Sequence, residues 1–128
     1  MYYDDIRLFH VFIPRVMGTR FDLLTSGVPE DLISPVWDDI RSELLHLESM
    51  LNRFDPSSEV SRCNSGIAHP GGELSGMIFE CEKYKSRTGG LFDITKGEGT
   101  SLDFGGFAKG FALRFVRDRL VEAGVGSA

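Results

Sequence analysis

Residues 101–124 read Ser-Leu-Asp-Phe-Gly-Gly-Phe-Ala-Lys-Gly-Phe-Ala-Leu-Arg-Phe-Val-Arg-Asp-Arg-Leu-Val-Glu-Ala-Gly. A short apolar run that carries Asp103 enters the double glycine at 105–106, and an amphipathic pattern leaves it. The apolar residues of this pattern recur near one face at a period of 3.6 residues, which predicts a helix over about 106–123 that stops at Gly124. The positions that form this face are Ala108, Ala112, Phe115, Val116, Leu120 and Ala123.

The start of this predicted helix is a candidate anion site. A helix amino end has unpaired N–H groups and a partial positive charge, glycines allow close approach of a ligand, and Lys109 adds a cation. The order Lys109-Gly110-Phe111 differs from a Walker A loop, in which Gly-Lys is followed by Ser or Thr. A strand–glycine–helix turn is also an ordinary structural feature of α/β chains, so the pattern leaves both interpretations open.

Length and charge limit the classes of function. A chain of 128 residues is expected to form a single domain, and 14 Lys and Arg against 19 Asp and Glu give a net charge of −5. The absence of a basic stripe disfavours nucleic-acid binding. No apolar run approaches the roughly 20 residues of a membrane span. The amino terminus lacks the pattern of a signal peptide, so we expect a cytoplasmic protein.

The cysteines and histidines are scattered. Cys63 and Cys81 lack CxxC spacing, and His10, His46 and His69 form no pair with metal-ligand spacing. We therefore expect all five to be structural or surface residues.

Two strands are expected near the amino terminus. Residues 6–13 are rich in branched and aromatic side chains and are predicted to end at Pro14. Residues 19–25 form the second expected strand, entered through Gly18, which permits an unusual backbone angle. Residues 91–95 are a third, strand-like run, and residues 96–99 link it to the stretch quoted above.

Two further helices are expected in the middle of the chain. Apolar residues at steps of three and four predict a helix over about 34–54 that starts at Ser34-Pro35. Residues 55–64 are polar and are predicted to be a loop, and helical spacing returns over 73–87. Together with the helix over 106–123, these elements predict an α+β fold with a mainly antiparallel sheet and three packed helices.

Four stretches, taken in order, resemble one family. They are Met17-Gly-Thr, Arg53-Phe-Asp-Pro-Ser-Ser-Glu-Val-Ser-Arg-Cys-Asn, Thr88-Gly-Gly-Leu-Phe-Asp and Leu102-Asp-Phe-Gly-Gly-Phe-Ala-Lys-Gly. Each motif is weak by itself, but the ordered set is similar to the ApbE family of FAD:protein FMN transferases. The resemblance makes an anion site at the start of the last helix the preferred interpretation.

The resemblance implies a magnesium-dependent transferase. Family members move the FMN half of FAD onto a threonine hydroxyl of an acceptor protein and release AMP. Such chemistry depends mainly on positioning and on neutralising charge at the phosphoryl oxygens. The resemblance therefore implies FAD as substrate, Mg²⁺ as cofactor and an acceptor protein as partner. No catalytic residue is assigned.

The resemblance also implies which residues bind. Phe54 stands where relatives often have a tyrosine against the flavin, so stacking is retained but the phenolic hydroxyl is lost. The backbone carbonyl of Gly106 would correspond to a magnesium ligand. The residues expected to contact FAD are Met17, Phe54, Leu91, Phe92, Asp93, Asp103 and Lys109.

The chain departs from the family pattern in two places. Only residues 94–102 separate Asp93 from Asp103, where family members have a substantial insertion. Relatives also continue beyond the position of Ala128 into a second half of the fold, with an Asp/Thr loop that supplies magnesium ligands. We therefore expect one ApbE-like domain over 1–128 that lacks the insertion and the carboxy-terminal half, either as a shortened relative or as a fragment.

These departures keep other functions open. The chain could be a non-catalytic flavin-binding or protein-interaction module, or an FAD pyrophosphatase. An incomplete sheet exposes strand edges, which suits a homodimer or a complementing second half. Family members are often exported lipoproteins, in contrast to the location expected from this amino terminus.

Overall fold

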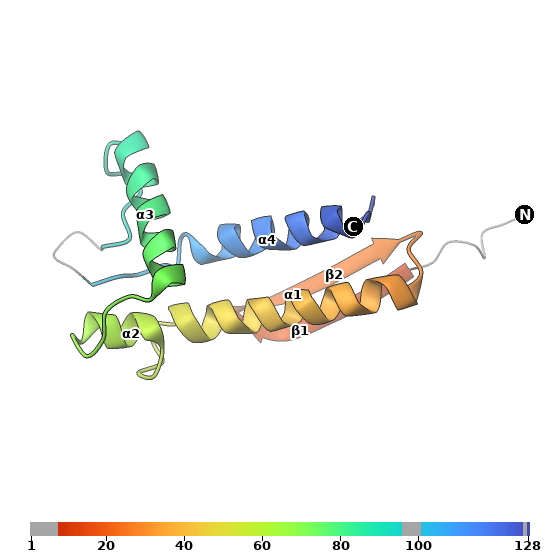
Figure 1. Cartoon of the computed structure of the whole chain (residues 1–128), viewed down its shortest axis with the longest axis horizontal. Helices are drawn as coiled ribbons and strands as arrows, with labels where there is room; N and C mark the ends of the chain where they lie inside the picture. Colours follow the sequence, from red (N-terminus) through yellow and green to blue (C-terminus); the bar gives the residue numbers. More distant parts are fainter. Residues whose placement is uncertain (1–7, 96–100, 127) are drawn as a thin grey trace, which may run out of the picture. The chain divides into compact units, whose positions relative to one another are not determined.

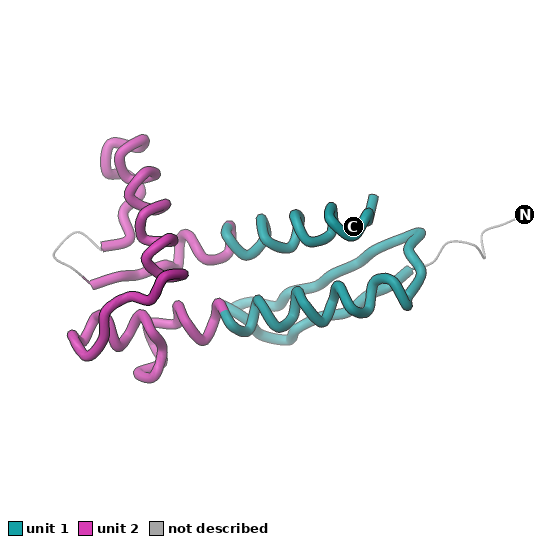
Figure 2. Tube along the Cα trace, viewed as in Figure 1, with its two compact units in different colours: residues 1–46, 111–128 teal, residues 47–110 magenta. Residues whose placement is uncertain are grey.

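A computed structural model describes residues 8–95, 101–126 and 128. The chain divides into two compact units (Figure 1, Figure 2). One unit holds the chain up to His46 and from Phe111 onward, and the other runs from Leu47 to Gly110. The first two residues of the strand expected at 6–13, and the whole linker expected at 96–99, lie outside the described residues.

The first unit begins with a β-hairpin. Strand β1, Leu8–Val16, pairs antiparallel with strand β2, Thr19–Ser26, as the sequence predicts. Alternation places one face of both strands toward the interior and the other toward solvent. The inward pairs are Phe9 with Thr25, Val11 with Leu23 and Ile13 with Phe21.

Pro14 does not end the first strand. Strand β1 continues to Val16, and the pairing register is irregular between Ile13 and Val16. Proline has no N–H to donate to a ladder, so it is tolerated where pairing is interrupted or at an edge strand. The prediction of a strand end at this proline is therefore wrong, because the irregularity accommodates it.

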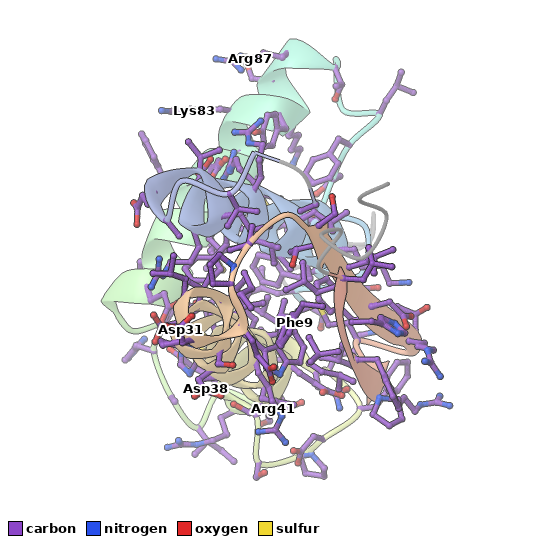
Figure 3. All side chains as sticks on the ribbon, turned by 90° about the vertical axis from the view of Figure 1, so that its right-hand side faces the viewer. Phe9, Asp31, Asp38, Arg41, Lys83 and Arg87 are labelled. Atoms are coloured by element: carbon purple, nitrogen blue, oxygen red, sulfur yellow. The ribbon has the colours of Figure 1, made fainter. Side chains whose placement is uncertain are left out.

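Helix α1, Glu30–Leu51, lies along the inner face of the hairpin (Figure 1). Trp37 stacks on Phe21 of β2, with ring centroids 6.2 Å apart and planes within 10°. In Figure 3, Phe9 lies between α1 and the hairpin, whereas Asp31 and Arg41 project outward. The buried stripe of the helix is Ile33, Val36, Ile40, Leu44, Leu47, Met50 and Leu51.

Helix α1 starts earlier than predicted. The carbonyl of Pro29 accepts hydrogen bonds from the N–H groups of Leu32 and Ile33, each at 3.1 Å, and Pro35 lies inside the helix. An internal proline removes one helical hydrogen bond. The extra turn, however, buries Ile33 completely. Burial of such a side chain contributes about 1.5–3 kcal/mol, which helps to offset the cost of the proline.

Helix α4, Ala108–Glu122, belongs to both units. Of the predicted apolar face in the first unit, Ala112, Val116 and Leu120 are buried, whereas Phe115 is half-buried and Ala123 is exposed. Within that unit, the guanidinium of Arg119 donates to Asp39 of α1 at 2.7 Å. Gly124, with a φ of +77°, follows the helix end as expected.

The second unit adds helix α2, Glu59–Asn64, and helix α3, Gly72–Arg87. Helix α3 confirms the prediction over 73–87, but α2 lies in a segment that was predicted to be a loop. Residues 91–95 form turns and no strand, so that prediction is wrong as well. Over the described ranges, the fold is thus α+β with an antiparallel sheet and three long helices as expected, plus one short helix.

The cysteines behave as packing residues. Cys81 is buried on α3, and burial raises the pKa of its thiol to about 12. Cys63 is half-buried on α2, where burial raises its thiol pKa as well.

Among the described residues, the helices are all too short or too polar to cross a lipid bilayer.

Candidate functional site

The glycine turn before α4 is closed by its own side chains and carbonyls. The carboxylate of Asp103 accepts the N–H of Gly105 at 2.9 Å. The carbonyl of Phe104 accepts the N–H groups of Phe107 and Ala108, at 2.9 and 2.8 Å. Phe104 itself is fully buried and anchors the turn. Three of the amides at this helix start are therefore already bonded, so they do not form an open cradle for a diphosphate.

Lys109 follows this turn in the first part of α4, and its side chain is exposed to solvent. An exposed ammonium can meet a phosphate as a point charge without help from the backbone amides. The expected anion contact at this turn therefore depends on Lys109, and its role remains a prediction.

An aromatic ring, a cation and a carboxylate lie next to one another at the end of α1. The guanidinium of Arg53 lies over the ring of Phe54, 4.4 Å from its centroid. Its Nε is 3.4 Å from Oδ2 of Asp103. The Asp103 side chain is only 16% exposed, whereas Phe54 is 78% exposed. The structure therefore brings together two of the residues expected to bind FAD, with Arg53 between them.

Phe54 is held by its backbone and not by burial. Its N–H donates to the side-chain carbonyl of Asn52 at 3.0 Å, directly after the end of α1. This bond turns the chain out of the helix and leaves the ring on the surface. The helix expected over 34–54 ends at Leu51, which is the last buried residue of its apolar stripe. Phe54 is available for stacking because it lies beyond that stripe.

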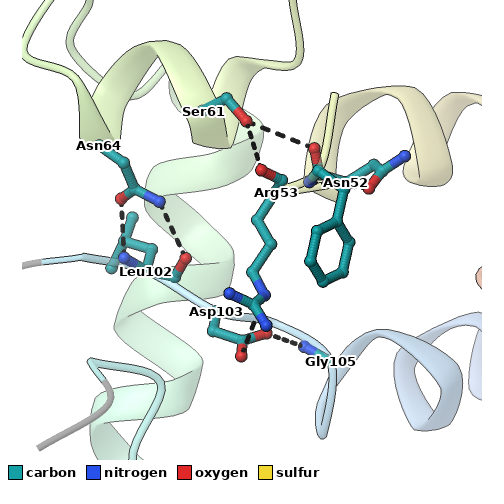
Figure 4. A network of polar contacts seen from close by, with 8 residues as sticks. Asn52, Arg53, Ser61, Asn64, Leu102, Asp103 and Gly105 are labelled. Carbon is teal, nitrogen blue, oxygen red and sulfur yellow. Dashed lines mark hydrogen bonds and ion pairs between the residues drawn. The ribbon is translucent and has the colours of Figure 1, made fainter. Parts of the chain in front are cut away.

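Helix α2 connects this end of α1 to the glycine turn (Figure 4). The helix begins at the cap residue Ser58, whose hydroxyl accepts the N–H of Ser61 at 3.1 Å. The hydroxyl of Ser61 donates to the carbonyl of Arg53 at 3.0 Å. At the other end of the helix, the amide of Asn64 bonds both the N–H and the carbonyl of Leu102, at 2.7 and 3.0 Å. These contacts fix the residues on either side of the Arg53–Asp103 pair.

A second group of expected residues follows α3. Oδ2 of Asp93 is 3.4 Å from Nζ of Lys85, and the N–H of Thr95 donates to its other oxygen at 2.8 Å. The hydrogen bonds from Thr95 lower the pKa of Asp93, and Lys85 lowers it further. The carbonyl of Ile94 accepts the N–H of Asp103 at 2.7 Å. Asp93 and Asp103 therefore lie on neighbouring stretches of backbone.

The two apolar members of this group differ in burial. Phe92 is half-buried and meets the ring of Tyr84 edge-on, with centroids 5.8 Å apart. Leu91 is 93% exposed. Neither the Tyr84 contact of Phe92 nor the exposure of Leu91 identifies a ligand. The expected contacts of both residues with FAD remain predictions.

Met17 lies in the first unit, at the turn of the hairpin. It has a φ of +52°, and the following Gly18 has a φ of +78°. Two positive φ values in a two-residue loop define a type I′ turn, which favours Asn-Gly. A methionine there is strained, and strained residues gather at functional sites. The contact of Met17 with FAD stays a prediction.

Comparisons with known proteins agree on one family. The sequence model described as the ApbE family matches residues 17–98, well over half of the chain. This chain belongs to the ApbE family. No curated protein matches it significantly.

Solved structures agree with this family. The ApbE protein of Thermotoga maritima has a TM-score of 0.76 at 16% identity, covering 91% of this chain and 53% of its own. The flavin transferase ApbE of Vibrio cholerae has a TM-score of 0.72 at 16% identity, covering 93% and 55%. The chain therefore has an ApbE fold and spans about half the length of these structures.

The magnesium ligand expected at the Gly106 carbonyl stays a prediction. Within residues 8–95, 101–126 and 128, no three His, Cys, Asp or Glu side chains come together to hold a metal ion. Asp93 faces Lys85 and Asp103 faces Arg53, so each carboxylate already lies beside a cation. Mg²⁺ prefers octahedral oxygen ligands. The carbonyl of Gly106 would supply only one such ligand and cannot complete the coordination by itself.

Sequence reasoning missed Arg53, Ser61 and Asn64 as parts of the candidate site. All three lie in the stretch 53–64, the second of the four stretches that resemble the family. Ser58 directly before Glu59 is a helix-start signal, with an N-cap residue and an acidic first turn, and it indicates α2. The pairing of Asn64 with Leu102 spans 38 residues, and no local pattern indicates it.

Proposed function

We propose that this chain is the flavin-nucleotide-binding portion of an FAD:protein FMN transferase. The proposal rests mainly on one observation, the Phe54 ring backed by Arg53 and placed beside the Asp103 carboxylate in a member of the ApbE family. One face of the ring meets the guanidinium, and most of the ring is exposed. A flat isoalloxazine is suited to stack on such a ring.

The proposed reaction is a phosphoryl transfer. The oxygen of an acceptor threonine forms a bond to the phosphorus of the FMN half, and the bond from that phosphorus to the AMP oxygen breaks. The threonine proton leaves to solvent or to AMP. In this scheme Phe54 stacks on the flavin, and Leu91 and Phe92 line the nucleotide. Asp93 and Asp103 accept hydrogen bonds from it.

Charge has a separate role in the proposal. Lys109 is exposed and would offset the charge of the diphosphate. Magnesium dependence belongs to the proposal as well, but it requires oxygen ligands beyond those that the described residues bring together. Met17 would contact the flavin from the hairpin turn.

The direct test mixes the chain with FAD and Mg²⁺, measures AMP by chromatography and looks for flavin-labelled threonine by mass spectrometry. AMP release together with a labelled acceptor supports the transferase. Release without a label indicates an FAD pyrophosphatase. Binding without turnover indicates a non-catalytic flavin-binding module. Absence of any change in FAD fluorescence on titration contradicts the flavin proposal in all three forms.

A pair of substitutions locates the binding site. Phe54→Ala should weaken FAD binding about two- to tenfold, as expected for loss of one aromatic contact. Phe54→Tyr keeps the ring and should restore the affinity. Ile67→Ala is the control, because Ile67 is 72% exposed in the same unit and is not part of the proposed site. Equal effects of the two alanine substitutions would contradict stacking on Phe54.

The proposal includes a partner for the hairpin. A two-stranded sheet has an unpaired outer edge on each strand, and isolated hairpins are marginally stable. Its outer face also exposes Leu8, Phe12 and Leu24. Sedimentation analysis of the chain distinguishes a homodimer from a monomer that requires a complementing second half.

A further inference from the structure

We propose that Asn64 is a positioning residue for Asp103 and, through it, for the flavin nucleotide. The inference rests on the proposed function for its ligand but not for its geometry. Asn64 touches neither Phe54 nor Asp103 in the described contacts, so no role in binding follows from its own chemistry. Its effect is exerted through the backbone of Leu102.

The side chain of Asn64 bonds both backbone groups of Leu102, as a neighbouring β-strand does in a sheet. Its carbonyl oxygen accepts the N–H of Leu102 at 2.7 Å, and its amide nitrogen donates to the carbonyl of the same residue at 3.0 Å (Figure 4). This pairing needs one acceptor and one donor on a side chain of this length. Aspartate has the same shape but offers two acceptors, one of which would face the Leu102 carbonyl.

Leu102 directly precedes Asp103, so this pairing fixes the backbone from which the carboxylate projects. The carboxylate is then held at both oxygens. Oδ1 accepts the N–H of Gly105 at 2.9 Å, and Oδ2 lies 3.4 Å from Nε of Arg53. The next residue, Phe104, is fully buried and keeps the turn in place. Loss of Asn64 should therefore loosen the direction of the carboxylate while the turn stays attached to the core.

The same helix fixes the other partner of Asp103. Ser61 donates to the carbonyl of Arg53 at 3.0 Å, and Arg53 extends its guanidinium to Asp103. The contacts form a closed circuit from Arg53 through Ser61, Asn64 and Leu102 to Asp103 and back (Figure 4). Because α2 has only six residues, a displacement at one of its ends is transmitted to the other. Helix α2 therefore positions the backbone on both sides of the ion pair, at Arg53 and next to Asp103.

The first experiment measures amide hydrogen exchange in the full chain and needs no ligand. In Asn64→Ala the Leu102 amide loses its acceptor directly. The Gly105 amide, which Asn64 does not touch, should also exchange at least about fivefold faster, because its acceptor is Asp103. Arg62→Ala is the matched control, since Arg62 is exposed on α2 outside the circuit, and both amides should exchange as in the wild type. Unchanged exchange at Gly105 in Asn64→Ala would overturn the proposal.

The second experiment measures FAD affinity by fluorescence titration in a double-mutant cycle. Asn64→Ala and Asn64→Asp should each weaken binding about tenfold, whereas Arg62→Ala should not. In an Asp103→Ala background, Asn64→Ala should change the affinity less than twofold, because the residue through which it acts is gone. If the double variant instead loses FAD affinity by the product of the two single losses, Asn64 does not act through Asp103, and the proposal is overturned. Failure of the wild type to bind FAD would instead contradict the proposed function and leave the exchange result to decide the geometry.

A glycine pair covers the case in which Asn64→Ala does not fold. A Cβ at Gly105 would stand 3.1 Å from Oδ1 of Asp103, so Gly105→Ala presses on the carboxylate from its other side. A Cβ at Gly110 meets nothing within 4 Å, so Gly110→Ala is the control. Gly105→Ala should weaken FAD binding at least threefold and Gly110→Ala should leave it unchanged. Unchanged affinity in Gly105→Ala would contradict a positioned Asp103.

Discussion

The hairpin with the first part of α1 and the segment from Asn52 to Ser65 are held in different ways. In the first region apolar side chains recur at regular steps, and they are buried where the pattern predicts. In the second region only Ser58 and Val60 are buried, and side chains bond to backbone groups at several points. The apolar region supports the fold, and the polar region sets the direction of the groups that are proposed to bind.

This difference separates stability from function. Burial of apolar surface has no preferred direction, so it stabilises the fold without aiming any particular atom. Hydrogen bonds are weaker in net terms but depend on direction. Substitutions in the apolar region should therefore change stability, and those around α2 should change ligand affinity more than stability.

The largest expected effect on stability comes from truncating a buried side chain in the apolar region. Ile40 is completely buried on α1, and Ile40→Ala should lower the free energy of unfolding by about 2–5 kcal/mol, since it removes buried methylenes and leaves a cavity. Urea denaturation followed by Trp37 fluorescence measures this. The neighbouring Arg41 is exposed, and Arg41→Ala should stay within about 0.5 kcal/mol of the wild type. A loss below 1 kcal/mol in Ile40→Ala would mean that this stripe does not support the fold.

The same difference explains what the sequence could predict. Helices α1, α3 and α4 and the hairpin were predicted because their apolar periodicity records which face is buried. The errors at Pro14 and Pro35 have one cause. A proline predicts an element boundary, but the pairing irregularity accommodates Pro14 and the burial of Ile33 accommodates Pro35. Local sequence patterns predict the helices and strands, whereas tertiary packing determines where each of them begins and ends.

The candidate site was predicted only in part. Family resemblance named Phe54 and Asp103, and the structure brings them together through Arg53. Asn64 and Arg53 were not predicted as site residues, because their contacts join positions far apart in the sequence and leave no local pattern. The open amide cradle at α4 was expected from helix physics, but the carboxylate of Asp103 and the carbonyl of Phe104 already bond those amides.

Thr25 is the polar exception in the apolar region and gives the next largest effect. Its side chain is 1% exposed, and its hydroxyl has no hydrogen-bond partner among the residues that the structure describes. Thr25→Val keeps the shape and removes the unpaired group, so it should stabilise the chain by about 1–2 kcal/mol in urea denaturation. Thr19→Val on the exposed end of the same strand should change stability by less than about 0.5 kcal/mol. Destabilisation by Thr25→Val would show that the hydroxyl is satisfied.

Met17 tests whether a strained residue of the hairpin serves function. Met17→Asn creates an Asn-Gly turn that suits the two positive φ values, and it should stabilise the chain by about 0.5–1 kcal/mol. If the side chain contacts FAD, the same substitution weakens binding. Met17→Leu keeps both the apolar side chain and the strain, so it should leave affinity and stability near those of the wild type. Full FAD affinity in Met17→Asn would remove Met17 from the proposed site.

The smallest effect concerns acid and falls in the turn at residues 93–95, which belongs to the same unit as α2. The pKa of Asp93 is lowered from 3.8, first by the hydrogen bonds from Thr95 and then by Lys85. Ionised Asp93 therefore stabilises the 93–95 turn above about pH 4, and this contribution is lost as the pH falls through the lowered pKa.

Thr95 provides the test. Thr95→Val removes the hydroxyl donor and should move the Asp93 titration, followed by the carboxyl carbon shift in NMR spectra, toward higher pH. Thr95→Ser keeps the donor and should titrate like the wild type. The backbone N–H of Thr95 still donates to Asp93 in both variants, at 2.8 Å in the wild type, so the shift should be partial. Identical titrations in the two variants would assign the lowered pKa to the backbone bond and Lys85 in place of the hydroxyl.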